Sequence, residues 1–365
     1  MGPAPAVADV RRAVRTVLAA LQGDTPTKAL LRGQDPAVPG QDQALRGAAR
    51  CVLVACSGGA DSLALAAATA FEAPRAGVRA GLVTVDHGLQ PGSAEQAARV
   101  AAVGYELGLD PVEVLRVEVG TGGGPEAAAR TARYAAFDAT AEALHAVVLL
   151  GHTLDDQAET VLLGLGRGSG PRSIAGMPAI ERHYRRPFLR LRRTTTVAAC
   201  AALGLEPWDD PHNADPGFQR ARLRHEVLPL LEDVLQGGVA EALARTADLL
   251  RDDLAALDAW ATAVLAAHHS EVINSAAGTP GGATARVDHD GEIEVARLLD
   301  LPRAVRTRVL RTWAEAAGAD PLSAERTAAL DALVTGWHGQ GPVELPGGVS
   351  VRRESGRLIA NQPRE

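Results

Sequence analysis

The sequence predicts an α/β fold with a doubly wound parallel sheet, followed by a mainly helical C-terminal domain with a small terminal hairpin. Between residues 50 and 160, short segments that are apolar on both faces alternate with helical segments. Strands of this kind lie in a parallel sheet that helices cover on both sides. Beyond residue 224, apolar residues recur at three- and four-residue spacing, which indicates helices.

The 365 residues exceed the usual size of one domain, so we expect several parts. Residues 1–49 contain a helical pattern at 7–21 and then, at 23–47, a segment rich in Gly, Pro, Asp and Gln that we interpret as a flexible insertion. Residues 50–225 form the predicted α/β domain, and residues 226–365 form the predicted helical domain.

The expected elements follow in chain order. Strands are expected at 52–55, 81–85, 112–119 and 147–150, with helices after them, including 93–107, 125–144 and one that begins near 155. The C-terminal part is expected to hold helices at 239–264 and 298–337, a linker at 274–285, and a hairpin within 343–359 that turns at Pro346-Gly347-Gly348.

Composition limits the class of protein. The formal net charge of −7 argues against coating of nucleic acid by bulk charge, although a local basic face would still permit a specific RNA contact. The three cysteines form no C-x-x-C pair, which fits a reducing compartment. No segment has the pattern of a signal peptide or a membrane span, so we expect a cytoplasmic protein without membrane contact.

Polar residues gather where the predicted strands end. Ligands of such sheets bind beyond the carboxyl ends of the strands. Three of these ends carry polar residues, namely 57–62, Asp86-His87-Gly88 and Gly151-His152-Thr153.

The stretch Ser57-Gly58-Gly59-Ala60-Asp61-Ser62 joins the first strand to a helix. The backbone N–H groups at such a junction have no partners, and glycine lets a ligand come close, so the loop suits phosphate. The alternative is an ordinary turn in which Ser62 caps the helix. The loop has no lysine, so it is not a Walker A motif.

The second candidate motif is Gly151-His152-Thr153-Leu154-Asp155-Asp156-Gln157-Ala158-Glu159-Thr160. A capping box with Thr153 as N-cap would explain Asp156 alone. Asp155 and Glu159 are four residues apart and so share one helical face. Carboxylates in this place suit Mg²⁺ or, equally, a substrate ammonium group.

Arginines form three further groups. Arg130 and Arg133 lie one helical turn apart, and a solvated face with a Glu126–Arg130 pair is the alternative. A basic stretch at 182–193 includes aromatic residues, and a later group consists of Arg220, Arg222 and Arg224. Such stretches suit single-stranded RNA, but an arginine-rich surface explains the charge equally well.

Several motifs together resemble the tRNA(Ile)-lysidine synthetase family of the PP-loop (ATP-pyrophosphatase) superfamily. The motifs that carry the resemblance are 56–62, 85–90, 126–134, 151–160, 167–170 with 175–177, and 220–229. Two positions depart from the family pattern, because Thr153 follows His152 where a second histidine is usual and Ala221 follows Arg220 where asparagine is usual.

The resemblance implies a PP-loop ATPase domain at 50–225, of the adenine nucleotide α-hydrolase-like type, and a tRNA-binding domain at 226–365. It implies a ligase that uses ATP and Mg²⁺ to join free L-lysine to C2 of the wobble cytidine of tRNA-Ile with a CAU anticodon. The tRNA is adenylated first, and AMP and pyrophosphate are released. A homodimer is compatible with the resemblance.

The resemblance also implies roles for particular residues. The ATP-binding residues are Ser57, Gly58, Gly59, Ala60, Asp61, Ser62, Asp86, His87, Gly151 and His152; the Mg²⁺ ligands are Asp61 and Asp156; the catalytic residues are Asp61, Arg130, Asp156 and Glu159; and the tRNA-binding residues are Arg133, Arg185, Arg186, Arg220, Arg222 and Arg224.

Two other functions stay open as alternatives. One is a tRNA thiolase of the same superfamily, although the cysteines near the loop, Cys51 and Cys56, lie on the preceding strand without a C-x-x-C pair. The other is a relative that binds nucleotide or RNA without catalysis.

Overall fold

The computed structural model describes residues 2–23, 51–88, 92–120, 125–168, 170–210, 215–277 and 291–361, without the side chains of 125–126 and 268–277. The chain divides into two compact units, Met1–Asp252 and Asp253–Glu365. The predicted division of function at 225/226 remains a prediction, and the insertion predicted at 23–47 lies outside the described residues beyond Gly23.

The first unit contains the predicted parallel sheet. Its strand order is β3-β2-β1-β4-β6-β5, and all neighbours are parallel except β5 and β6. The strands are β1 (Cys51–Ala55), β2 (Arg79–Asp86), β3 (Val112–Arg116), β4 (Ala146–Leu150), β5 (Ile180–Glu181) and β6 (Tyr184–Arg185). The two last strands were not predicted, and the third is shorter than expected. The carboxyl ends of β1, β2 and β4 lie at one edge of the sheet.

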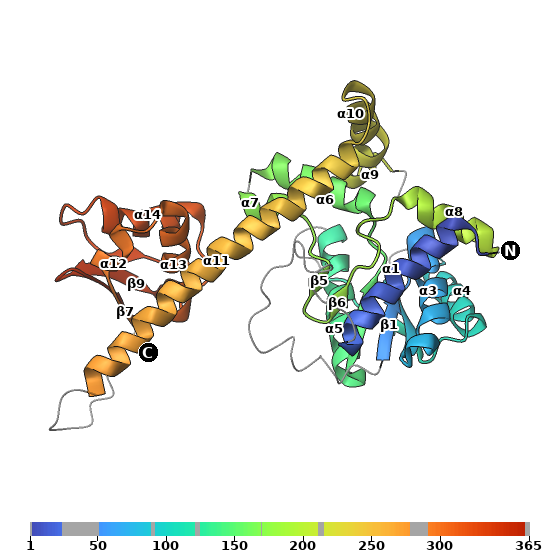
Figure 1. The fold of residues 1–365 in the computed structure, drawn as a ribbon, viewed down its shortest axis with the longest axis horizontal. Helices are drawn as coiled ribbons and strands as arrows, with labels where there is room; N and C mark the ends of the chain where they lie inside the picture. Colours follow the sequence, from blue (N-terminus) through green and yellow to red (C-terminus); the bar gives the residue numbers. More distant parts are fainter. Residues whose placement is uncertain are drawn as a thin grey trace. The chain divides into compact units, whose positions relative to one another are not determined.

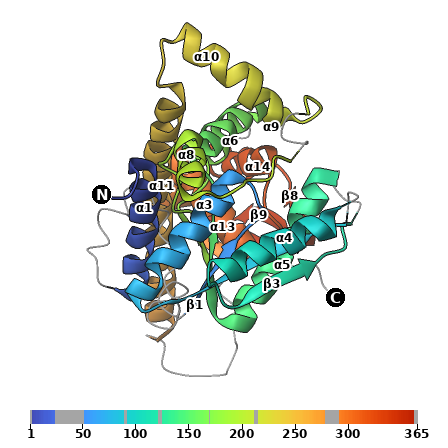
Figure 2. The same ribbon diagram turned by 90° about the vertical axis from the view of Figure 1, so that its right-hand side faces the viewer.

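Helices cover both faces of the sheet, as predicted. Val52 and Val54 of β1 pack on one face with residues of α1, α3, α4 and α8, whereas Cys51 and Leu53 pack on the other with α5. These helices are α1 (Pro5–Gln22), α3 (Ala60–Glu72), α4 (Ser93–Glu106), α5 (Pro125–Leu144) and α8 (Arg193–Leu203). Figures 1 and 2 show the helices around the sheet.

Helix α1 confirms the helical pattern predicted at 7–21 and belongs to the core. It lies alongside α3 and α8 (Figure 1, dark blue). Its buried stripe consists of Val7, Val10, Val14 and Leu18. Arg15 on the same helix donates to both carboxylate oxygens of the buried Glu72, at 2.9 and 2.7 Å. The helix therefore holds together two helices that begin at the sheet edge.

The first unit ends in a helical layer. It consists of α6 (Leu154–Arg167), α7 (Pro171–Ile174), α9 (Gln219–Arg222), a π-helical turn (Leu223–Val227), α10 (Leu228–Val234) and the beginning of α11 (Val239–Ala277). Leu154 and Ala158 of α6 form a small cluster with Leu228 and Ala240. Figure 2 shows α9 beside α6.

The second unit combines helices with an antiparallel sheet. The sheet order is β7-β10-β9-β8, from β7 (Glu292–Glu294), β8 (Val343–Glu344), β9 (Ser350–Glu354) and β10 (Arg357–Asn361). Its helices, besides the end of α11, are α12 (Val295–Leu299), α13 (Arg303–Ala316) and α14 (Ala324–Thr335). The predicted hairpin turn at Pro346–Gly348 joins β8 to β9 and is part of a larger sheet.

Three further findings bear on the predictions. Helix α11 continues to Ala277, so the linker expected from 274 does not begin there, and 278–285 lie outside the described residues. The three cysteines are buried thiols. None of the described helices has the length and apolar character that a membrane span needs.

Candidate active site

The loop after β1 has the backbone geometry of an anion cradle. Gly58 has a φ of +88°, which disfavours other residues, and a Cβ there would lie 2.6 Å from the amide nitrogen of Gln96. Gly59 precedes the first turn of α3, and no side chain caps this helix. The Ser62 hydroxyl donates to the Gly59 carbonyl at 2.9 Å and accepts from the Ser57 N–H at 3.2 Å. Ser62 therefore closes the loop and leaves the helix N-terminus available.

Two neighbouring segments fix this loop. At the end of β4, Gly151 lies so close to α3 that a Cβ would be 3.1 Å from the Asp61 carbonyl carbon and oxygen and 3.2 Å from the Ser62 nitrogen. The Trp208 N–H donates to the Gly58 carbonyl at 2.9 Å. The first and second predicted motifs are therefore in contact, as expected for residues at the carboxyl ends of neighbouring parallel strands.

Asp156 uses its two carboxylate oxygens for different tasks. Oδ2 accepts from the backbone N–H of Thr153 at 2.7 Å and from its hydroxyl at 2.8 Å, and this completes a capping box at the start of α6. Oδ1 accepts from Nη2 of Arg193 at 2.5 Å and lies 3.5 Å from Nη2 of Arg224. The predicted capping role and an electrostatic role are therefore both present.

Arg193, the first residue of α8, lies at the centre of the acidic residues. Its Nε is 3.1 Å from Oδ2 of Asp61, and its Nη1 is 4.0 Å from Oε1 of Glu159. Its backbone N–H donates to Oδ2 of Asp155 at 2.7 Å. With the contact to Asp156, one residue touches all four acids of the two motifs.

A second arginine, Arg224, binds the buried Glu159 from the opposite side. Nε donates to Oε1 at 2.8 Å and Nη2 to Oε2 at 3.2 Å, and Glu159 is fully buried. The π-helical turn closes through the Leu228 N–H, which donates to the Leu223 carbonyl five residues earlier. The turn adds one residue relative to an α-helix and so lets Arg224 face the acids while Leu228 enters the core.

Asp155 ties the site to the beginning of α11. Its Oδ1 is 3.1 Å from Nη2 of Arg192, which also contacts Glu241 at 2.9 Å. Glu232 accepts from the N–H groups of Val239 at 3.0 Å and Ala240 at 3.1 Å. Asp155 is one of the acids predicted to hold a ligand, and in the structure it is the partner of Arg192 and of the backbone N–H of Arg193.

The two aspartates have opposite pKa shifts. Burial raises the pKa of Asp61, against the effects of Arg193 and the Thr196 hydroxyl, and the charge of Asp156 raises it further. Burial would also raise the pKa of Asp156, but Arg193, His152 and the Thr153 donors together lower it to about 2. The pKa of Arg193 is raised, because the charges of Asp156, Asp61 and Glu159 outweigh the effect of its burial.

Two histidines at the sheet edge are held neutral. Burial lowers the pKa of His152 to about 3, and the charges of Arg186, Arg130 and Arg133 contribute. Burial and Arg133 likewise lower the pKa of His87. The Nδ1 atoms of both rings are buried without a hydrogen-bond partner within the part of the chain that the structure describes. Their placement agrees with the prediction that both contact a ligand, which stays a prediction.

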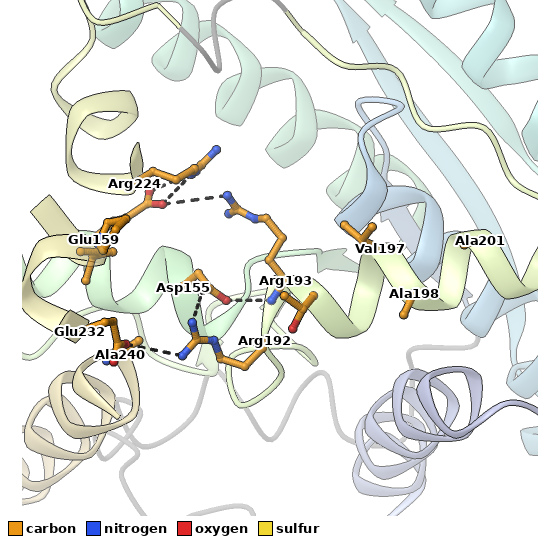
Figure 3. Close-up of a pocket in the computed structure, with 13 residues that line it drawn as sticks. Asp155, Glu159, Arg192, Arg193, Val197, Ala198, Ala201, Arg224, Glu232 and Ala240 are labelled. Atoms are coloured by element: carbon orange, nitrogen blue, oxygen red, sulfur yellow. Dashed lines mark hydrogen bonds and ion pairs between the residues drawn. The ribbon is translucent and has the colours of Figure 1, made fainter. Parts of the chain in front are cut away.

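A cavity of about 550 Å³ lies beside the acids (Figure 3). One wall is a face of α8, with Val197, Ala198 and Ala201, and Leu228 and Pro229 of α10 contribute to another. Arg193 and Arg224 both point toward Glu159 in this view. The volume is in the range of small-molecule sites. Arg193 lines this cavity and also contacts the four acids described above.

Two other residues of the predicted site lie at the same edge of the sheet, and each of them contacts other residues of the chain. Asp86 at the end of β2 accepts from the Ser93 hydroxyl at 2.7 Å and from the Gly88 N–H at 3.0 Å, and these bonds lower its pKa. Arg130 lies over the Tyr134 ring, with its guanidinium carbon 4.7 Å from the ring centroid. The side chain of Glu126, the alternative partner of Arg130, is outside the described residues.

The structure places part of the predicted RNA-binding set away from the surface. Arg185 and Arg186 are buried: Arg185 donates to the Arg182 carbonyl at 2.8 Å and Arg186 to the Pro178 carbonyl at 2.7 Å. Arg186 also pairs with the carboxylate of Glu181 at 2.8 Å. Both guanidinium groups therefore have partners within the chain, and their predicted contact with tRNA stays a prediction. Arg222 is exposed and paired with Glu226 at 2.9 Å. Arg220 is half-buried.

Arg193, the cation that contacts all four acids, was not among the predicted site residues. Arg193 was one of many arginines in a basic stretch, and its partner Asp61 lies 132 residues away in the chain. Thr196, whose hydroxyl hydrogen-bonds Asp61, was not singled out at all. The one available signal was the position of Arg193 at the start of a helical segment, since Asp61 and Asp156 likewise lie in the first turns of α3 and α6.

The carboxylates fit the chemistry of Mg²⁺. No group of three or more His, Cys, Asp or Glu side chains is arranged for a metal within the described ranges. Mg²⁺ needs no such group, because it usually takes one or two carboxylates together with substrate phosphates and water. Asp61 and Asp156 direct one oxygen each at a single cationic group, Arg193, beside the phosphate loop.

The fold and the loop define a PP-loop protein: residues 40–231 match the PP-loop domain family, and residues 294–359 match the TilS substrate binding domain. The chain belongs to the tRNA(Ile)-lysidine synthase family. The tRNA(Ile)-lysidine synthase of Streptomyces coelicolor is 54% identical, over 99% of this chain and 100% of the relative. Those of Thermobifida fusca and Salinispora tropica are 53% and 52% identical, over 99% of this chain and 99% and 98% of the relatives.

Proposed function

We propose that the protein joins L-lysine to C2 of the wobble cytidine, position 34, of an isoleucine tRNA with the anticodon CAU. The cytidine O2 attacks the α-phosphorus of ATP, a bond forms between them, and pyrophosphate leaves. The ε-amine of lysine then attacks C2, the C2–O2 bond breaks, AMP leaves with O2, and the amine loses a proton. Membership of the tRNA(Ile)-lysidine synthase family supports this reaction.

One observation carries the proposal. The loop that begins α3, the acids that begin α6 and the arginine that begins α8 converge at one edge of the sheet. Three helix N-termini direct the positive ends of their dipoles there, and the N-terminus of α3 also offers N–H groups that no side chain caps, which favours a polyphosphate. The acids beside them suit a cation. The site therefore combines the elements that transfer of AMP from ATP requires.

The chain's own residues would act as follows. The Ser57–Ser62 loop binds the phosphates that leave as pyrophosphate, and Arg130 binds the α-phosphate. Asp61 and Asp156 would hold Mg²⁺, which when bound neutralises charge on the phosphates. Glu159 would orient the lysine ammonium group or support the metal site. Asp86, His87, Gly151 and His152 would contact the nucleotide.

Recognition of tRNA is proposed for exposed and half-buried arginines. Arg133, Arg220 and Arg222 remain candidates in the first unit. Arg224 would act through its contact with Glu159, since its side chain lies in the acid cluster. A match of residues 294–359 to the TilS substrate binding domain supports a tRNA contact in the second unit. A cytoplasmic location and a homodimer are further parts of the proposal.

The experiment is direct. Purified protein is incubated with ATP, Mg²⁺, radiolabelled lysine and an isoleucine tRNA transcript with the CAU anticodon, and label in the RNA is measured. A matched transcript with a single change of the wobble cytidine to uridine serves as the control. Label in the first RNA only supports the proposal. No label, from folded protein that binds ATP, would reject it.

The same assay distinguishes the alternatives. A thiolase would incorporate sulfur from a thiol donor and no lysine. Burial raises the pKa of the Cys56 thiol, which makes it a poor nucleophile and argues against a role in sulfur transfer. A non-catalytic relative would bind ATP and tRNA without releasing pyrophosphate.

A further inference from the structure

The oxygens that Asp61 and Asp156 offer to a ligand are already occupied from within the chain. Each carboxylate has one oxygen committed to a threonine: Oδ1 of Asp61 accepts from the hydroxyl of Thr196 on α8, and Oδ2 of Asp156 accepts from Thr153, the N-cap of its own helix α6. The other oxygen of each, Oδ2 of Asp61 and Oδ1 of Asp156, is bound by Arg193 at 3.1 and 2.5 Å. Arg193 therefore occupies the two oxygens that could bind Mg²⁺.

We propose that Arg193 is a tethered cation that takes the place of the metal in the ligand-free protein and withdraws from the two aspartates when the metal binds. This inference rests on the proposed function, because it uses the assignment of Asp61 and Asp156 to Mg²⁺. It gives a positioning role to a residue that neither motif contains.

The charge balance of the cluster supports the exchange. Asp61, Asp156 and Glu159 face two guanidinium groups, those of Arg193 and Arg224, so that one negative charge is uncompensated. When Arg193 withdraws, two negative charges are uncompensated, and one divalent cation would neutralise both. A metal at about 2 Å from the two oxygens would lie so close to the guanidinium that the two cations would repel strongly.

The geometry also gives Arg193 somewhere to move. Its backbone is fixed, because its N–H is bound to Asp155 at the start of α8. Its side chain lines the cavity of about 550 Å³ and is 23% exposed. A rotation about the side-chain bonds into this cavity needs no change in the helix. As long as the guanidinium of Arg193 stays between Asp61 and Asp156, it keeps the two carboxylates directed at one point. The metal site therefore remains assembled in the ligand-free protein.

The test is metal binding by the full-length, ligand-free protein, with Mn²⁺ as the probe and electron paramagnetic resonance as the measurement. We expect Arg193→Met to bind Mn²⁺ roughly tenfold or more tightly than the unsubstituted protein, because a repelling charge is removed. Arg193→Lys, which keeps the charge, should bind as weakly as the unsubstituted protein. Arg190→Met is the matched control, since Arg190 is 74% exposed and pairs with Asp248.

A double variant links the gain to the proposed atoms. Arg193→Met combined with Asp156→Asn should lose the gain in affinity. Equal or weaker Mn²⁺ binding by Arg193→Met, or a gain that survives in the double variant, would overturn the inference. Neither tRNA nor lysine is present, so failure of the lysine ligation assay and failure of this test are separate results.

A second measurement follows Arg193 in the unsubstituted protein and uses a variant only to assign the signal. The Nε–H of Arg193, bound to Asp61, gives a nitrogen–proton resonance that can be assigned by its absence in Arg193→Lys. Saturation of the unsubstituted protein with Mg²⁺ and the non-cleavable analogue α,β-methylene-ATP should shift this signal and speed its exchange with water. An unchanged, protected signal would show that Arg193 stays in place.

Discussion

At the scale of single residues, the site depends on carboxylates whose two oxygens have different partners. In Asp156 one oxygen completes a capping box and the other faces Arg193. In Asp61 one oxygen meets Thr196 and the other meets Arg193. Substitutions that remove the charge and substitutions that remove the cap should therefore have different effects.

Asp156→Asn separates the two tasks. The amide oxygen can still accept the Thr153 N–H, whereas the charge that faces Arg193 is lost. We expect stability to fall by about 2 kcal/mol, because the amide lacks the charge that holds the pKa of Asp156 at about 2. We also expect a fall in pyrophosphate release of roughly a hundredfold or more. Asp156→Ala and Asp61→Ala should also abolish pyrophosphate release, with tRNA binding largely kept. Urea unfolding measures the stability, filter binding the tRNA affinity, and a pyrophosphate assay the release of pyrophosphate.

Asp9→Asn is the matched control for these carboxylate substitutions. Asp9 forms an exposed pair with Arg12 on α1, at 3.1 Å. Surface pairs of this kind contribute little to stability. Pyrophosphate release at an undiminished rate by Asp156→Asn would show that the charge at this position has no role in the reaction.

His152 should make the stability depend on pH. Its pKa is about 3 in the folded protein and 6.5 in the unfolded chain. The unfolded chain therefore binds more protons between these values, so stability is complete above pH 6.5 and is lost as the pH falls toward 3. At pH 5, His152 lowers the free energy of unfolding by about 2 kcal/mol relative to its value above pH 6.5.

His152→Gln should remove that contribution. Urea unfolding at pH 7 and pH 5 measures the difference in free energy of unfolding between the two conditions. The difference should be smaller in His152→Gln by about 2 kcal/mol. His145→Gln serves as the comparison, because His145 lies in the turn that follows α5. Equal pH dependence in His152→Gln and the unsubstituted protein would contradict a buried, neutral His152.

The residue-level predictions from sequence were strongest where the contacts are local. The loop at 57–62 and the capping box at Thr153 and Asp156 are defined by neighbours in the chain. Arg193 could not be predicted, because its contact to Asp61 joins segments brought together only by the sheet. Arg185 and Arg186 show the converse. A run of arginines predicts positive charge, but it does not predict that these two side chains are buried and bind backbone carbonyls and, for Arg186, the carboxylate of Glu181.

At the scale of elements, the site depends on three helices that begin at one edge of the sheet. The spacing between β4 and α3 is set by Gly151, which has no room for a side chain. The relative position of α3 and α8 is set by α1, which packs on both. These contacts hold the two sides of the acidic cluster in place.

Gly151→Ala should weaken ATP binding. The added Cβ would lie 3.1 Å from backbone atoms of Asp61, so the strand end and the phosphate loop must move apart by a few tenths of an ångström. We expect ATP affinity to fall roughly tenfold, measured by calorimetry, because loop N–H groups lose their alignment. Gly166→Ala in α6 is the control, with nothing within 4 Å of the new Cβ. Equal ATP affinity in both variants would contradict this role.

Leu18→Ala should destabilise the first unit. Leu18 is fully buried between α1 and its neighbours, and removal of such a side chain leaves a cavity that costs about 2 to 5 kcal/mol. Arg12→Ala, at a position with a 70% exposed side chain, should change stability by less than about 0.5 kcal/mol. Urea unfolding measures both, and equal effects would show that α1 is not part of the core.

At the scale of the whole molecule, two units each have their own core. The first surrounds the parallel sheet, and the second is formed by residues such as Leu298, Leu310, Leu330 and Leu358. The proposed phosphate chemistry involves residues of the first unit. The match to the TilS substrate binding domain falls in the second. The two activities should therefore respond to different substitutions.

Leu310→Ala should affect the second unit selectively. We expect two unfolding transitions in calorimetry, of which this variant lowers one and Leu18→Ala lowers the other. The cost for the affected transition is about 2 to 5 kcal/mol. ATP affinity should stay unchanged in Leu310→Ala while tRNA affinity falls. A single transition that both variants lower equally would show that the two cores unfold together.

Most of the architecture could be predicted because it follows from periodic patterns. The buried strands β1, β2 and β4 and the helix Pro125–Leu144 have strong patterns of apolar residues. The strands β5 and β6 contain two residues each, which is too short for any period to be seen. The four-stranded sheet of the second unit was predicted only as a hairpin, because β7 joins β10 from 65 residues away.

A single amino acid separates the π-helical turn Leu223–Val227 from an ordinary α-helix. Loss of one codon there would leave a continuous helix of nearly the same composition. Arg224 would then be rotated by about 100° relative to Leu228, so the guanidinium could no longer face Glu159 while the leucine stays in the core. The segment thus accepts changes of residue more readily than changes of length, and an in-frame deletion would inactivate an otherwise well-folded protein.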